Sequence, residues 1–258
     1  MLDVPGARLH YRLLGRGPLV LIMQGGDGDA DAMDAVAGEL AEEFTVLTYD
    51  RRGLSRSTLE DPGEVPGIDG HADDAARLLQ ALSDGPALVV GSSFGAFTAL
   101  NLLARHPHLV ARLIAHEPPA AQLLPASERP TGPLTPHEMG LSFTAGEPGI
   151  ELPPPSRYRE ANLEFFSTRD APTLHRFHLD LEAAKASPAE IVPAAGVLFP
   201  ESFPRRCAVA LAEFLGTGLA ELPGGHNGFV THPHGFAARL QELLPVSGNP
   251  ASAGERPR

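Results

Sequence analysis

The sequence predicts an α/β protein with a mostly parallel, doubly wound sheet that carries an inserted lid or cap. Three observations predict this fold class. Strand-like and helix-like segments alternate along most of the chain, as in a parallel sheet covered on both faces. The chain has 258 residues, of which 43% are hydrophobic, so it can bury a large core. One Pro-rich segment of about 70 residues interrupts the alternation and is too long for a plain connection.

The elements follow from local periodicity. Apolar and β-branched runs predict strands at 7–15, 18–24, 44–50, 87–91, 111–117, 189–197 and 218–225. Apolar residues at helical spacing predict helices at 30–43, 71–85, 94–106, 202–216 and 236–244. In the second of these helices we expect Asp73 and Asp74 in the first turn and Gly85 just past the end, because helix termini prefer these residue types there.

The interruption sets the expected domain organisation. Residues 1–117 and 189–246 form the core, and residues 118–188 form the lid or cap. Prolines cluster in this insertion, and clear helical periodicity appears only near 159–170. We expect residues 247–258 to be a disordered tail because they combine Ser, Gly, Pro and charged residues.

Composition narrows the class of function. The net charge of −12 argues against a general nucleic-acid binder and against a partner of anionic membranes. The charge says little about a small-molecule substrate, which is the partner that we expect. No signal peptide or span of about 20 apolar residues is visible, so we expect a cytoplasmic protein. The single cysteine, Cys207, lies on a predicted helix face and is expected to be buried. The oligomeric state stays open, with a homodimer as one option.

A candidate nucleophile lies between a predicted buried strand and a predicted helix. The sequence GSSFG at residues 91–95 fits G-x-S-x-G, and its strand-turn-helix context is what gives the short pattern weight. A serine on such a tight turn projects its hydroxyl above the sheet, toward a helix N-terminus that favours negative charge. The register makes Ser93 the nucleophile and Ser92 its small neighbour; the competing interpretation is an ordinary Gly/Ser turn.

The base is expected late in the chain, in the loop after the last strand. That loop contains His226, whose imidazole can take the serine proton during attack. The other histidines are weaker candidates. His232 and His234 have no partner at metal-ligand spacing. His175 and His178 are interpreted as residues of a helix surface, with the lining of a substrate pocket under the lid as the alternative.

An oxyanion hole needs two N–H donors. One is the amide of Phe94, directly after the nucleophile, and the other belongs to the loop after the strand at 18–24. We assign this second donor to Gly26, with Gly25 as the alternative, and assign substrate contacts to Gln24 and Gly25. The competing interpretation is a tight turn without a catalytic amide.

With these motifs the sequence resembles the α/β-hydrolase superfamily over nearly its whole length. The matching stretches are LIMQGG, YDRRGLSRS, GSSFGAF, HEPP and PGGHNGF, and the resemblance is strongest to small bacterial serine hydrolases of the esterase, lactonase and haloperoxidase-like type. It implies the α/β-hydrolase fold and an enzyme that needs no metal or organic cofactor. It also implies that Asp50 and Arg52 fix a turn. Gln24 departs from the family pattern, which usually has a histidine before the glycine.

The triad acid also departs from the pattern. Most of the superfamily carries an aspartate after the strand that follows the cap, but residues 197–199 contain no carboxylate. Some members carry a glutamate at the end of the earlier strand, which implies Glu117. Glu201 is the alternative, and a Ser/His dyad with water is a third option. A carboxylate at Glu117 would orient the imidazole and stabilise its charged form.

Three hypotheses of function follow. The first is a serine hydrolase that cleaves an ester, thioester or lactone through an acyl-enzyme on Ser93. The second keeps the fold but uses the Ser/His pair as acid and base in a lyase or cyclase of secondary metabolism. The third is a non-enzymatic ligand-binding protein, and the presence of both Ser93 and His226 counts against it.

Overall fold

The main sheet carries the catalytic candidates along one edge. The computed structural model describes residues 1–26, 28–132, 134–141, 146–152, 154 and 156–244. Among these residues, seven strands pair in the order β10-β9-β8-β7-β4-β5-β3. The strands are β3 (Tyr11–Gly15), β4 (Leu19–Met23), β5 (Thr45–Tyr49), β7 (Ala87–Ser92), β8 (Val110–His116), β9 (Glu190–Gly196) and β10 (Ala220–Leu222). Only β3 runs antiparallel to its neighbour; the other pairs are parallel.

A second, small sheet extends the N-terminal side. It contains β1 (Leu2–Val4), β2 (Ala7–Leu9) and β6 (Thr58–Leu59), paired antiparallel in that order. The strand predicted at 7–15 is therefore two strands, which belong to different sheets and meet at His10. The stretch ARLHYRLLG contains no glycine or proline before Gly15 and therefore gave no signal for this break.

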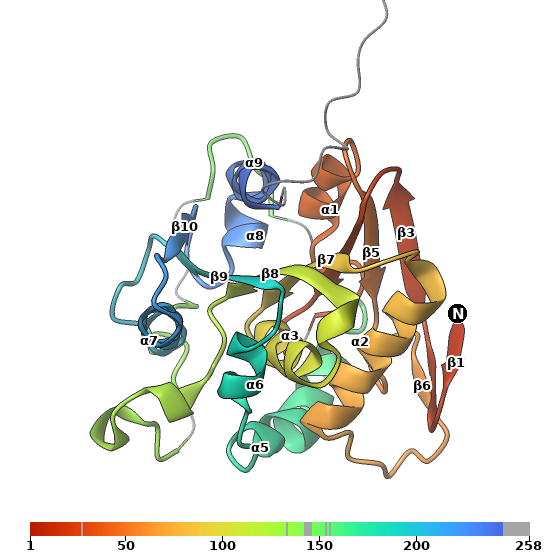
Figure 1. The fold of residues 1–258 in the computed structure, drawn as a ribbon, viewed down its shortest axis with the longest axis horizontal. Coiled ribbons are helices and arrows are strands. Elements are labelled where there is room, and N and C mark those ends of the chain that lie inside the picture. The colour runs from red at the N-terminus through yellow and green to blue at the C-terminus, as the bar shows by residue number, and fades with distance from the viewer. Residues whose placement is uncertain (27, 133, 142–145, 153, 155, 245–258) are drawn as a thin grey trace, which may run out of the picture.

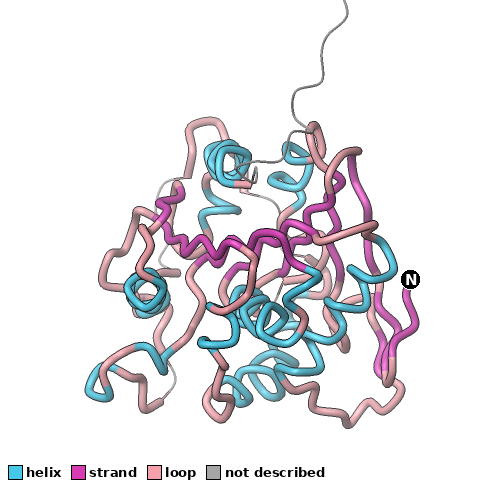
Figure 2. The backbone as a smooth tube through the Cα atoms, viewed as in Figure 1, coloured by secondary structure: helices cyan, strands magenta, loops and turns pink. Residues whose placement is uncertain are grey.

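Helices cover both faces of the main sheet, as the alternation predicts (Figures 1 and 2). On one face, α1 (Asp34–Leu40) packs against α9 (Pro233–Leu243) beside the short α8 (Gly228–Thr231). On the other face, α2 (Ile68–Leu82) and α6 (Leu181–Lys185) pack against α3 (Phe94–Arg105), and α7 (Phe203–Leu215) packs against β9. Each face has its own apolar cluster, and Cys207 is buried within α7, as predicted.

One helix begins earlier than its sequence indicates. The helix predicted at 71–85 starts at Ile68, so Asp69 occupies the first turn and our placement of Asp73 and Asp74 there is wrong. Asp74 instead lies buried and pairs with Arg52. The helix also ends at Leu82, before Gly85 and without a left-handed glycine, because Ser83 already adopts an extended conformation.

The described residues of the segment between β8 and β9 form short helical pieces. They are η2 (Ala121–Leu123), η3 (Ala126–Glu128), α4 (Arg159–Phe165), a π-helical turn η4 (Phe166–Asp170), α5 (Ala171–Leu174) and α6. The helix predicted at 159–170 is therefore real but widens into a π turn in its second half. Between α5 and α6, His175 and His178 lie exposed on a loop, so our interpretation of them as helix surface is wrong. The predicted tail lies outside the described residues.

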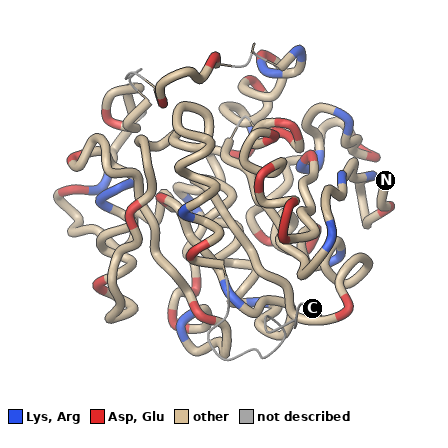
Figure 3. Tube along the Cα trace, turned by 90° about the horizontal axis from the view of Figure 1, so that it is seen from above, with Lys and Arg blue, Asp and Glu red and all other residues tan. Residues whose placement is uncertain are grey.

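Charged residues are spread over the molecule. In the view of Figure 3, Lys and Arg are interspersed with the more numerous Asp and Glu. This distribution fits the acidic net charge and offers no broad basic stripe in that view. Along the part of the chain that the structure describes, no helix combines the length and apolar character needed to cross a bilayer.

Candidate active site

Ser93 lies at a sharp turn between β7 and α3. Its backbone has φ 53° and ψ −120°, a region that L-residues rarely adopt, and such strain concentrates at functional positions. The turn is possible because α3 approaches β4 very closely: a Cβ on Gly95 would lie 2.1 Å from the carbonyl oxygen of Met23. The glycine of the motif is therefore required by a backbone contact, and the motif has the strand-turn-helix context that we predicted.

Glu117 occupies the equivalent position on the neighbouring strand. The register pairs Ser92 with His116, so Ser93 and Glu117 both follow the last paired residues of adjacent parallel strands. Glu117 is also strained, with φ 48°. Its side chain is fully buried, and Oε1 accepts a hydrogen bond of 3.0 Å from the amide of Gly196 at the end of β9. The Glu117 side chain therefore lies at the carboxyl edge of the sheet and is held there by the neighbouring strand β9.

His226 joins the two residues. It lies in the loop after β10, where Nε2 is 3.0 Å from Ser93 Oγ and Nδ1 is 2.6 Å from Glu117 Oε2. An ionised Glu117 can only accept, so Nδ1 carries the proton and the Nε2 of a neutral imidazole is free to accept from the serine hydroxyl. The geometry therefore fits proton transfer from Ser93 to His226.

The ionisation of Glu117 is supported by its surroundings. Burial raises the pKa of this carboxyl, but the hydrogen bond from His226, the nearby imidazoles and the Gly196 amide lower it by more. The net effect holds the pKa of Glu117 below its ordinary value. The carboxylate is accordingly charged at neutral pH and can stabilise an imidazolium.

A second histidine lies behind the first. The ring of His116 stacks near that of His226, with centroids 6.2 Å apart and an angle of 27° between planes, and its Nδ1 is 3.1 Å from the hydroxyl of Ser92. Burial lowers the pKa of His116 to about 4, against the opposing effect of Glu117. His116 is therefore neutral at pH 7 and adds no positive charge beside His226. Sequence reasoning missed this residue and treated Ser92 only as a packing neighbour.

Phe94 and the loop after β4, which contain the expected oxyanion donors, lie beside Ser93. Phe94 is the first residue of α3, so its amide has no acceptor within the helix. The loop after β4 passes beside Ser93, since a Cβ on Gly25 would lie 3.6 Å from Ser93 Cβ. Gly26 is covered by the ring of Phe166, which would lie 2.6 Å from a Cβ there. Glycine is thus the residue that permits this close approach.

Gln24 begins the same loop but is almost completely buried, at 2% exposure. Its side-chain amide finds no hydrogen-bond partner among the described residues, whereas its backbone carbonyl accepts from Arg51. Sequence reasoning gave Arg51 no role. It lies between Asp50 and Arg52. Asp50 accepts from the amide of Arg56 and so holds its turn, as predicted. Arg52 instead pairs with Glu64 and with Asp74 of α2.

The remaining candidates lie elsewhere. Glu201 is exposed on a turn, and the carboxylate that contacts His226 is that of Glu117. His234 is exposed and pairs with Glu39, whereas His232 contacts the hydroxyl of Thr231. Within the described ranges, no three His, Cys, Asp or Glu residues gather as metal ligands would.

Comparison with known proteins agrees with this geometry. Residues 18–147 match the family model of the alpha/beta hydrolase fold. The chain belongs to this family, and the fold together with its hydrolase relatives identifies it as a hydrolase. It is 39% identical over 258 aligned positions to the uncharacterized hydrolase YraK of Bacillus subtilis (strain 168), and the alignment covers 94% of each chain.

Two further relatives are more distant. The chain is 31% identical over 113 residues to 2-(acetamidomethylene)succinate hydrolase of Mesorhizobium japonicum, covering 44% of this chain and 40% of that one. Among solved structures, an alpha/beta hydrolase from Sphaerobacter thermophilus superposes with a TM-score of 0.69 at 21% identity, covering 93% of this chain and 98% of the other. This structural likeness supports the fold.

Proposed function

We propose that the protein is a serine hydrolase that cleaves a carboxylic ester, thioester or lactone of a small molecule through an acyl-enzyme on Ser93. The observation that carries the proposal is the continuous chain of contacts from the Ser93 hydroxyl through His226 to the buried Glu117, at 3.0 and 2.6 Å. Nucleophile, base and acid are each held by a different β-strand or the loop that follows it. This arrangement performs nucleophilic catalysis without a further reactant besides water.

In the first half of the reaction, Ser93 Oγ attacks the substrate carbonyl carbon while its proton moves to His226 Nε2. The carbonyl oxygen becomes an oxyanion, which accepts hydrogen bonds from the amides of Gly26 and Phe94. The tetrahedral intermediate then collapses, the bond to the alcohol or thiol breaks, and His226 gives its proton to that leaving group. The acyl group remains on Ser93.

Water completes the cycle. His226 takes a proton from a water molecule, whose oxygen attacks the acyl carbon, and the bond to Ser93 breaks as the proton returns to the serine oxygen. Glu117 stays ionised throughout and stabilises the imidazolium that forms in each half. Release of the carboxylic acid product restores the Ser93 hydroxyl and the neutral imidazole of His226 beside the ionised Glu117.

The loop after β4 gives the site its shape. Gly25 lies close enough to Ser93 to contact the acyl group, whereas the buried side chain of Gln24 acts on the substrate through the position of the loop. We place the cap at residues 118–188 and assign to it the choice of substrate, because its residue Phe166 covers Gly26. The non-hydrolytic alternative rested on a missing triad acid and on Gln24. The contact between the Glu117 carboxylate and His226 removes the first of these two reasons.

A fluorophosphonate probe combined with p-nitrophenyl acetate hydrolysis tests the proposal. Wild-type protein should be labelled and should release p-nitrophenol, whereas Ser93→Ala should do neither and His226→Ala should lose turnover. Ser92→Ala, in which the adjacent hydroxyl is removed, is the matched control and should still be labelled. Absence of both labelling and turnover in the wild-type protein would refute the proposal.

A further inference from the structure

Arg51 is a buried cation beneath the oxyanion loop. Only 2% of its side chain is exposed, and its guanidinium donates hydrogen bonds to three consecutive carbonyl oxygens, those of Gln24, Gly25 and Gly26. Burying a guanidinium carries a large desolvation cost unless its donors are satisfied. Here both terminal nitrogens of the planar guanidinium donate to one short segment of backbone. This is the segment to which we assign an oxyanion donor.

The geometry of the peptide unit explains why this matters. The carbonyl of Gly25 and the amide N–H of Gly26 belong to one planar trans peptide, so they point in opposite directions. When Arg51 draws the Gly25 oxygen toward itself, it also fixes the direction of the Gly26 N–H. Loops of glycine are otherwise free to rotate such a peptide, because glycine adopts many backbone conformations at little cost.

The same guanidinium contacts the second donor residue. Its Cζ lies 4.7 Å from the centroid of the Phe94 ring, a cation–π distance. The ring of His71 packs edge-on against Phe94 at 5.5 Å, and Phe166 does so at the same distance. Arg51 therefore contacts both residues that we assign as oxyanion donors, Gly26 through its carbonyl oxygen and Phe94 through its ring.

Arg51 is in turn held by the segment inserted between β8 and β9. Asp170, at the end of the π turn η4, lies 3.1 Å from Arg51 Nη2 and 3.0 Å from His71 Nε2, and only 1% of its side chain is exposed. Burial raises the pKa of Asp170, but His71 and Arg51 lower it by more, so the net pKa lies below its ordinary value. The buried pair is thus a true ion pair.

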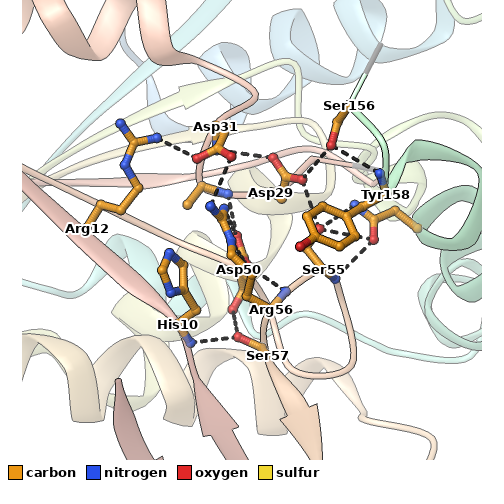
Figure 4. Close-up of polar contacts among 12 residues, drawn as sticks. His10, Arg12, Asp29, Asp31, Asp50, Ser55, Arg56, Ser57, Ser156 and Tyr158 are labelled. Atoms are coloured by element: carbon orange, nitrogen blue, oxygen red, sulfur yellow. Dashed lines mark hydrogen bonds and ion pairs between the residues drawn. The ribbon is translucent and has the colours of Figure 1, made fainter.

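A second group of contacts joins the loop after β5, which contains Arg51, to the inserted segment. Asn162 of α4 donates to the hydroxyl of Ser55. Ser55 itself donates to Asp29 at 2.8 Å, and Ser156 also contacts Asp29 (Figure 4). The loop after β5 therefore meets the insertion at two places, through Arg51 and through Ser55. The insertion and the oxyanion loop cannot move independently while both contacts are made.

We propose that Arg51 is a positioning residue that fixes the oxyanion hole, and that Asp170 of the cap, together with His71 of α2, sets its place. The proposal rests on the function proposed above. It explains why two charged residues 119 positions apart are buried together beside the nucleophile. An ion pair that served stability alone would be replaceable by any other balanced pair of side chains.

The test separates positioning from stability. Asp170→Asn keeps the shape of the side chain but removes its charge. The double variant Arg51→Gln/Asp170→Asn removes both charges, so no unpaired ion stays buried, yet the shorter glutamine amide cannot serve three carbonyls. Arg52→Lys is the matched control, because Arg52 is the adjacent buried arginine and pairs with Asp74 without an assigned contact to the oxyanion loop. Unfolding temperature, kcat and KM for p-nitrophenyl acetate, and the affinity of a trifluoromethyl ketone are measured for each.

We expect the double variant and Asp170→Asn to lose about 10- to 100-fold in kcat with KM nearly unchanged, below the loss of about 10²–10³ seen when a donor is removed outright. Affinity for the ketone, whose adduct with Ser93 carries an oxyanion, should fall by the same factor. Arg52→Lys should keep kcat and ketone affinity. Unchanged kcat in a folded double variant, or lost kcat with unchanged ketone affinity, would overturn the inference. If the wild-type protein neither reacts with the probe nor turns over ester, the proposed function itself fails.

Discussion

Replacement of Glu117 by glutamine removes the charge of the proposed acid while it preserves the size of the side chain. The glutamine oxygen can still accept from Gly196, so the backbone at the end of β9 keeps its hydrogen bond. What changes is the contact with His226. A glutamine amide group can donate to Nδ1 and so favour the tautomer that places the proton on Nε2, where it blocks acceptance from Ser93.

The magnitude follows from the distance of 2.6 Å between His226 Nδ1 and Glu117 Oε2. At that separation two unit charges attract by roughly 6 kcal/mol if the effective dielectric constant is about 20. The imidazolium exists only after His226 takes the serine proton, so this attraction acts mainly on the transition state. Since each 1.36 kcal/mol is tenfold in rate, the expected loss in kcat is on the order of 10⁴, as for other serine triads that lose their acid.

Steady-state hydrolysis of p-nitrophenyl acetate measures the loss, and thermal unfolding checks that the variant is folded. Glu201→Gln is the control, because Glu201 is exposed and should keep wild-type kcat. KM should change little in either variant, since the acid contacts no substrate. A folded Glu117→Gln variant with nearly wild-type kcat would refute the assignment of Glu117, and a loss confined to Glu201→Gln would transfer the role to that residue.

Three further predictions concern stability and reactivity. Folding lowers the pKa of His116 from 6.5 to about 4, so the unfolded chain binds more protons between these two pH values. The unfolding free energy, measured by chemical denaturation, should therefore fall by up to about 1.4 kcal/mol per pH unit on acidification through this window. His116→Gln should flatten this slope, and an equal slope in the variant would argue against the role of His116. Gly70→Ala should stabilise the protein by about 0.5–1 kcal/mol, because a Cβ at this position of α2 meets open space. Gly95→Ala should destabilise the protein severely, because its Cβ would clash with β4. A similar unfolding temperature for the two variants would contradict this packing. Burial raises the pKa of the Cys207 thiol to about 12, so iodoacetamide at pH 8 should modify it only after unfolding, and rapid modification of the folded protein would show the helix packing to be wrong.

The order of strands and helices could be predicted because each element carries its own local pattern. The buried run before Ser93 and the glycines around it predict the turn, and the position of His226 after the last strand places it above the same sheet edge. The helix begins at Ile68, earlier than predicted. Ile68 is buried on the same helix face as His71 and Ala72, and this burial belongs to the tertiary packing, which local periodicity does not show.

The support of the site could be predicted only in part. Glu117 was inferred from a resemblance, and its contact with His226 depends on strand register, which places the ends of β7 and β8 side by side. Arg51 and Asp170 gave no signal, because their pairing joins distant parts of the chain and the inserted segment has weak periodicity. Charged residues in a sequence are expected on the surface, so a buried pair is visible only once the fold brings the two together.

Detection of the acyl-enzyme tests the central claim most directly. Wild-type protein is mixed with p-nitrophenyl acetate, quenched with acid within its first turnovers, digested and examined by mass spectrometry. We predict an acetyl group on Ser93, absent in Ser93→Ala and retained on Ser93 in Ser92→Ala. Turnover without any acyl group on Ser93, or an acyl group on Ser92 that persists in Ser93→Ala, would contradict the proposed mechanism.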